Sequence, residues 1–112
     1  MRRTFIQTEI FSKRLDERRR SGLLEEVEQA ILENPLVGDV ISGTGGVRKF
    51  RVTDPLRGKG KRGGHRVLYL DLPDQERTFL LYLYGKDESE DISPEQKKLI
   101  AALVGAIKRG RQ

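Results

Sequence analysis

Hydrophobic positions in the first third of the chain predict a strand followed by two helices. Residues 4–7 (TFIQ) form a short predicted strand. Ile10, Phe11 and Leu15 mark one face of a first helix, and the apolar stripe of a second helix consists of Leu23, Leu24, Val27, Ala30 and Ile31. Ser21 is the expected N-cap of the second helix, and the Asn34-Pro35 pair should end it. The short connection between the helices predicts an antiparallel helical hairpin.

The middle of the chain predicts a loop and three further strands. Residues 36–46 form the expected loop, which closes with the glycine-rich run Gly43-Thr44-Gly45-Gly46. Segments 47–53, 65–71 and 77–84 are rich in Val, Leu, Phe or Tyr and are bounded by Gly, Pro or Asp. Because short connections join consecutive strands, an antiparallel meander is expected.

The end of the chain predicts a well-capped helix. Ser93, Pro94 and Gln96 occupy the N-cap, first and third positions of a capping box, and Gly110 should lie just past the helix end. The apolar stripe consists of Leu99, Ile100, Leu103, Val104 and Ile107. The order of elements predicts a single α+β domain over residues 1–112, with the helices over one face of a small, mainly meander antiparallel sheet and the other face partly free.

Positive charge is concentrated in one segment. Residues 47–66 contain eight Lys or Arg and one acid, Asp54, which gives a net charge of +7, whereas the other 92 residues sum to −2. A local basic patch is the electrostatic pattern expected for a protein that binds a phosphate backbone. A solvated loop with surplus cations is the plain alternative.

Composition excludes several other classes. The chain has no cysteine and one histidine, so disulfides, thiolate metal sites and the usual zinc sites are excluded. No apolar run approaches the ~20 residues needed to cross a bilayer, and no apolar segment of a secretory signal follows the basic start. A cytoplasmic protein without a membrane partner is expected.

Cations on the predicted strands are the first candidates for chemistry. Because alternate residues of a strand share a face, Phe50 is assigned to the core, and Lys49 and Arg51 to the opposite face with Cα atoms roughly 7 Å apart. Arg48 points with Phe50 and is expected to be structural. If Arg66 shares the face of Lys49 and Arg51, three cations converge there and could stabilise negative charge that develops on a phosphate. Simple binding of RNA or of an acidic partner is the alternative.

The loop between the first two of these strands could hold phosphates. Lys59, Lys61 and Arg62 lie in a run that matches GxGxxG, but a strand follows it where a dinucleotide site requires a helix. His65 could exchange protons near neutral pH or simply be solvated.

The last predicted strand adds aromatic and basic candidates. Tyr82 and Tyr84 alternate along it and could stack on bases, although packing is the commoner role of a strand tyrosine. Lys86 follows the strand and could contact a phosphate. The acids between residues 87 and 91 could attract magnesium, but their place before a helix N-terminus favours a role toward the helix dipole.

Three runs together carry a family resemblance. Residues 43–52 (GTGGVRKFRV), 58–69 (GKGKRGGHRVLY) and 83–86 (LYGK) resemble the HigB branch of the RelE/ParE toxin superfamily, and the likeness extends over nearly the whole chain. The resemblance implies a RelE-like fold and the toxin of a bacterial type II toxin–antitoxin system. It further implies a ribosome-dependent endoribonuclease that cleaves mRNA in the A site by attack of the RNA 2′-hydroxyl, without metal or cofactor, and so inhibits translation. The implied partners are the ribosome, mRNA and a helix-turn-helix antitoxin similar to HigA.

By motif position, the resemblance assigns catalysis to Lys49, Arg51, Arg66 and Lys86. Many members carry a tyrosine or histidine near the end of the chain, and this sequence has only acids, Ile92 and the capped helix after Lys86. The general base is therefore open. Lys49 is the first candidate because surrounding cations would favour its neutral form. His65 and Tyr84 are the others.

Two other functions remain open from the sequence. ParE-like members of the superfamily inhibit DNA gyrase without cutting RNA, and a non-catalytic RNA-binding module would use the same basic patch. The density of cations at Lys49, Arg51 and Arg66 favours the nuclease.

Overall fold

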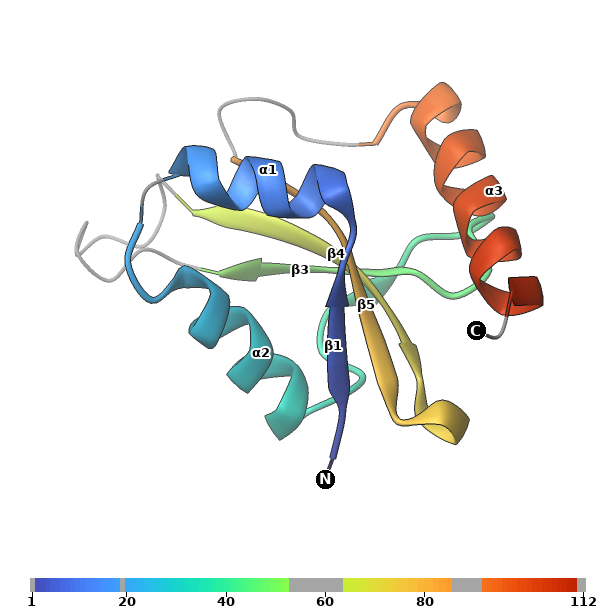
Figure 1. Ribbon diagram of the computed structural model, residues 1–112. Coiled ribbons are helices and arrows are strands. Elements are labelled where there is room, and N and C mark those ends of the chain that lie inside the picture. Colours follow the sequence, from blue (N-terminus) through green and yellow to red (C-terminus); the bar gives the residue numbers. More distant parts are fainter. Residues whose placement is uncertain (1, 19, 53–63, 86–91, 111–112) are drawn as a thin grey trace.

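The computed structural model describes residues 2–18, 20–52, 64–85 and 92–110 (Figure 1). Its elements in chain order are β1 (Thr4–Gln7), α1 (Glu9–Arg18), α2 (Leu23–Glu33), β2 (Asp39–Val40), β3 (Arg48–Val52), β4 (His65–Leu72), the 3-10 helix η2 (Pro73–Gln75), β5 (Arg77–Gly85) and α3 (Pro94–Gly110). The predicted α+β class and the order of the long elements are confirmed.

The strands form one five-stranded sheet in the order β1-β5-β4-β3-β2. β3, β4 and β5 pair antiparallel as consecutive neighbours, which is the expected meander. β1 pairs in parallel with β5, with Thr4 opposite Arg77. The sheet is therefore mixed at one edge, because the chain crosses α1 and the rest of the sheet between these two strands.

Both faces of the sheet are covered, which corrects the expectation that all helices lie on one face. The side chains of α1 and α2 bury Phe11, Val27 and Ile31 against one face. On the other face, Val104 of α3 packs with Leu68 and neighbouring residues of the sheet. Figure 1 shows α3 well apart from α1 and α2. β4 and β5 have nearly continuous apolar runs and supply side chains to both cores, so neither face could stay free without exposing one of them.

Helix α1 covers the part of the β5 edge that β1 does not reach, since β1 pairs only with residues 77–80 of β5. The Thr8 N–H donates to the Leu80 carbonyl at 3.1 Å, and the Thr8 hydroxyl donates to the Leu81 carbonyl at 2.9 Å. The same hydroxyl accepts the Phe11 N–H at 3.1 Å, so Thr8 also caps α1. Arg14 Nε donates to the Leu83 carbonyl. These bonds satisfy strand groups that have no neighbouring strand.

Two details of the helical pair differ from the sequence prediction. Gly22, with φ of 83°, is the N-cap residue of α2 in place of Ser21, and it makes no side-chain capping bond. The two helices cover the same face but diverge from their connection in a V instead of lying side by side (Figure 1). The predicted end of α2 is confirmed, since Asn34 has extended backbone and its N–H donates to the Ala30 carbonyl.

The capping box of α3 is confirmed in both directions. The Ser93 N–H donates to Gln96 Oε1 at 2.9 Å, and the Gln96 N–H donates to Ser93 Oγ at 3.2 Å. The predicted apolar stripe is only partly buried. Val104 lies in the core, but Leu99 is 72% exposed and Leu103 is 37% exposed. The helix therefore presents an apolar margin to solvent.

The predicted loop over residues 36–46 contains the short edge strand β2, which pairs antiparallel with β3. The glycine-rich run that follows is held by Thr44, whose buried hydroxyl donates to the Ile41 carbonyl at 2.6 Å and accepts the Val47 N–H at 3.2 Å. The Gly45 carbonyl accepts a hydrogen bond from Lys108 Nζ at 2.8 Å. The run thus anchors the end of α3 to the sheet.

Candidate nucleic-acid interface

Strand alternation brings three cations to the face of the sheet that carries α3. Phe50 of β3 and Val67 of β4 belong to the core under α1 and α2, so Lys49, Arg51 and Arg66 point to the other side. In the β3–β4 register, Arg51 lies directly opposite Arg66. Directly opposed residues have Cα atoms about 4.5–5.5 Å apart. The expected convergence of these three residues on one face is confirmed.

The Arg51–Arg66 pair is unfavourable unless it serves a ligand. Like charges directly opposite each other destabilise an antiparallel pair. Arg66 is partly buried, and its Nη1 is buried without a hydrogen bond to any residue that the structure describes. Arg51 is exposed, and a Cβ placed on Gly64 would come within 3.4 Å of its Cδ, so the glycine leaves room for the arginine stem. An anion between the two guanidinium groups would remove the repulsion and supply acceptors.

A β-bulge in β5 places two tyrosines on this same face. Leu68 of β4 lies opposite Tyr82, whereas the next residue, Tyr69, lies opposite Leu80, so Leu81 is the extra residue. Tyr84 lies opposite Arg66, and its ring centroid is 5.7 Å from that of Tyr82. The face therefore contains the cross-strand rows Arg51–Arg66–Tyr84 and Lys49–Leu68–Tyr82.

The two tyrosines differ in accessibility. Tyr84 is 2% exposed, so its ring would have to be uncovered before it could stack on a base. Tyr82 is half-buried, and the Cζ atom of Arg14 lies 4.9 Å from its ring centroid. No motif or periodic pattern in the sequence singles out Arg14. The i to i+3 spacing from Phe11 places it at the border of the buried face, but only the fold shows that α1 lies along β5 at Tyr82.

His65 lies on the opposite face of the sheet from the cations. It pairs with Val52 and Gly85 at one end of β4, and strand alternation points it the same way as Val67. Its side chain is buried. The expected role of Arg48 is confirmed, because its Nη1 donates to the Leu36 and Gly38 carbonyls at 2.8 and 3.0 Å.

Several predicted contacts lie outside the described residues. These are Lys59, Lys61, Arg62 and Lys86, together with the acids at positions 87–91. Among the residues that are described, no group of three or more His, Asp or Glu side chains is placed to hold a metal ion. Within the same ranges, no helix has the length and apolar character needed to cross a membrane.

Comparison with known proteins identifies the family of this chain. A family described as the RelE toxin of the RelE/RelB toxin–antitoxin system matches residues 13–110. The structure also resembles that of a mutant of the E. coli toxin RelE in the free state, with a TM-score of 0.53 and 19% sequence identity over 80% of this chain and 90% of that one. This likeness supports the RelE-like fold. The chain therefore belongs to the RelE family of toxins from toxin–antitoxin systems.

Proposed function

We propose that this toxin is a HigB-like, ribosome-dependent endoribonuclease that cuts mRNA in the A site and thereby stops translation. The observation that carries the proposal is the direct opposition of Arg51 and Arg66, with Lys49 two residues away on the same strand face. A pair of guanidinium groups on directly opposed strand positions matches the paired oxygens of a phosphodiester. A third cation on that face provides a nitrogen that can exchange a proton.

The reaction that fits these groups is an internal transfer within the RNA. Lys49 Nζ is the proposed acceptor of the 2′-hydroxyl proton, and the resulting oxygen attacks the adjacent phosphorus. The bond from phosphorus to the 5′-oxygen breaks, and that oxygen takes a proton, with Lys86 as the proposed donor. The products are a 2′,3′-cyclic phosphate and a 5′-hydroxyl. Arg51 and Arg66 stabilise the extra negative charge on the phosphate oxygens as they form.

The remaining basic residues are assigned to RNA binding. Lys59, Lys61 and Arg62 precede β4 in sequence and belong to the same basic segment of the chain as Arg66. Phosphate contacts of this kind give affinity and position without reading sequence. We assign His65 and Tyr84 to RNA binding as well, with the condition that binding exposes both side chains, because each is buried in the free protein. The mRNA is reached on the ribosome in the cytoplasm, and a HigA-like helix-turn-helix antitoxin is the proposed neutralising partner.

The test is induced expression in a bacterial host, with the 5′ ends of transcripts mapped before and after induction. We expect new ends inside reading frames and in register with codons. Lys49→Ala combined with Arg66→Ala should remove them. A suitable control is Arg109→Ala, which removes an exposed cation near the end of α3. Growth arrest with intact transcripts would refute the nuclease and favour a ParE-like gyrase inhibitor. RNA binding without arrest or cleavage would leave a non-catalytic module.

A further inference from the structure

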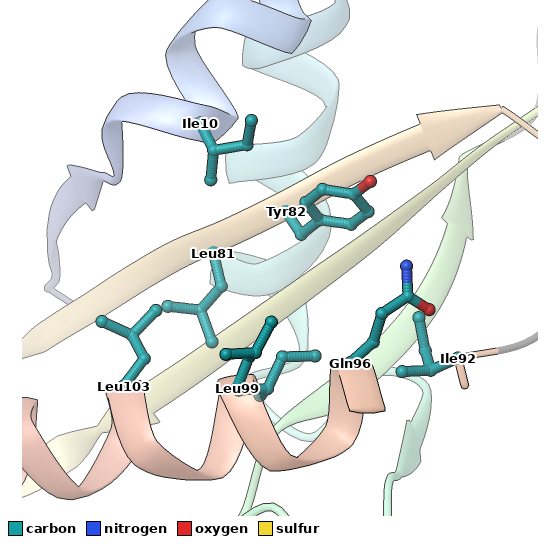
Figure 2. Close-up of a pocket in the computed structure, with 8 residues that line it drawn as sticks. Ile10, Leu81, Tyr82, Ile92, Gln96, Leu99 and Leu103 are labelled. Carbon is teal, nitrogen blue, oxygen red and sulfur yellow. The ribbon is translucent and has the colours of Figure 1, made fainter. Parts of the chain in front are cut away.

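An apolar groove of about 280 Å³ lies between α1, β5 and α3, on the face of the sheet that carries the cations (Figure 2). Leu81 and Tyr82 of β5 form its floor, Ile10 of α1 forms one wall, and Leu99 of α3 forms the other. Ile10 is 45% exposed and Leu99 is 72% exposed, although both were predicted to lie in apolar stripes. Neither core requires these two side chains, so the groove is an open apolar surface of the free protein.

The groove is continuous with the cationic face. Tyr82 pairs with Leu68, and Leu68 pairs with Lys49, so Tyr82 is separated from Lys49 by two strand spacings, or about 10 Å between Cα atoms. Arg14 lies on the α1 side of the groove with its Cζ 4.9 Å from the Tyr82 ring centroid. Positive charge therefore lies directly beside the tyrosine on α1 and two strands away from it on β3.

One polar group is fixed in this apolar surface. Gln96 Oε1 accepts the Ser93 N–H at 2.9 Å, and this bond orients the whole amide. Within the part of the chain that the structure describes, the two hydrogens of Gln96 Nε2 have no acceptor and remain for another partner. Figure 2 shows the amide of Gln96 directed across the groove toward Tyr82, with its nitrogen at the tip. The capping box thus holds a hydrogen-bond donor beside an aromatic ring.

We propose that this groove binds a nucleobase of the A-site mRNA next to the cleaved phosphate, and that it sets codon preference. The proposal rests on the nuclease function above. Tyr82 stacks on the base, Ile10 and Leu99 contact its edges and outer face, and Gln96 Nε2 donates to an acceptor on the base. A planar ring, an oriented amide donor and flanking cations together suit a nucleotide, because single-stranded RNA is recognised by stacking and by hydrogen bonds to base edges.

The test is the single-turnover rate of cleavage on purified ribosomes, with all four bases placed in turn at each A-site codon position. Tyr82→Leu keeps the floor apolar but removes the ring, and should lower kcat/KM about 5- to 150-fold, as loss of one stacked base does. Tyr82→Phe keeps the ring and should recover most of the rate that Tyr82→Leu loses. Gln96→Glu keeps an acceptor for the Ser93 N–H but removes the donor, and should change the ranking of bases at one codon position. Lys98→Gln makes the same change in charge at an exposed position of α3 and should leave the ranking unchanged.

A second readout does not depend on cleavage. A ribosome-bound mRNA with 2-aminopurine in the A-site codon and 2′-deoxyribose at the cleavage point should show quenching by the wild type that Tyr82→Leu removes. Equal rates and an unchanged ranking in Tyr82→Leu and Gln96→Glu would overturn the base pocket but not the nuclease. If the wild type fails to cleave, the nuclease is refuted, and Tyr82-dependent quenching alone decides base binding. Weaker neutralisation by the antitoxin with an intact codon ranking would assign the groove to that protein and overturn the proposal.

Discussion

The opposed arginines of β3 and β4 should lower the stability of the free toxin. Arg51 and Arg66 are a direct cross-strand pair. For two charges about 7 Å apart in an effective dielectric of about 40 to 80, Coulomb's law gives a repulsion of about 0.6–1.2 kcal/mol. Measured cross-strand pairs fall in the same range, at about 0.2–1 kcal/mol. We therefore expect removal of either charge to raise the free energy of unfolding.

A double-mutant cycle isolates this term from other effects of each substitution. Arg51→Met, Arg66→Met and the double variant keep apolar stems and remove charge. In urea unfolding at about 10 mM salt, each Met substitution should raise the free energy of unfolding by about 0.5–1 kcal/mol less in the background of the other substitution than in the wild type. The reason is that the first substitution has already removed the repulsion. At about 1 M salt, where the Debye length is about 3 Å, this coupling should vanish.

Two results would contradict the reasoning. Independent effects of the two substitutions at low salt would mean that solvent already screens the pair. A favourable coupling in the wild type would mean that the guanidinium groups stack on each other or share an acceptor. Phosphate added at constant ionic strength gives a further check, since a ligand of the pair should stabilise the wild type more than either variant.

Three further predictions concern the scaffold. Tyr69→Phe removes the hydroxyl that donates to the Pro35 and Val37 carbonyls at 2.9 and 2.8 Å, and should cost about 1–3 kcal/mol in urea unfolding. Burial raises the pKa of Tyr69 from 10.0 to about 12. The contribution of the neutral hydroxyl to folding stability is therefore complete below pH 10 and is lost as the pH rises through 12. The decline in melting temperature at alkaline pH should accordingly be shallower in Tyr69→Phe. Gly38→Ala should lower the free energy of unfolding by well over about 2 kcal/mol, since its Cβ would lie 2.1 Å from the Lys49 carbonyl oxygen. Gly43→Ala, at a similar positive φ with no atom within 4 Å, should lower it by only about 1 kcal/mol. Equal losses would show that backbone conformation alone matters. Ser93→Ala should cost about 1 kcal/mol by loss of the α3 cap, and an unchanged unfolding midpoint would mean that the first turn is held by packing alone.

The features that could be predicted from the sequence are those that one local rule determines. Alternation along β3 placed Lys49 and Arg51 together, and the capping box of α3 was visible as Ser93 and Gln96. The direct opposition of Arg51 and Arg66 was not predictable, because register depends on how β3 and β4 pair across a connection of a dozen residues. His65 and Arg66 point to opposite faces of β4, which separates the histidine from the cations.

The errors came from contacts between distant segments. A helical stripe gives the direction of a helix toward a sheet but not which face it covers, so the position of α3 could not be inferred. Ile10 and Leu99 fit the periodic patterns of their helices and yet are exposed. They line the groove that lies between α1, β5 and α3, where neither side chain is covered by the other helix. The role of Arg14 depended on the same arrangement.

The bulge in β5 connects these local and distant effects. Without Leu81 as an extra residue, strict alternation would place Tyr82 and Leu80 on one face, and Leu80 belongs to the core under α1. The bulge instead turns both Leu81 and Tyr82 toward α3. The Leu81 carbonyl at this irregular point accepts the Thr8 hydroxyl, so the residue that caps α1 also stabilises the bulge. One hydroxyl therefore helps to place Tyr82 beside the cations and Arg14 over its ring, and the proposed chemistry depends on that edge of the sheet as much as on the charged residues themselves.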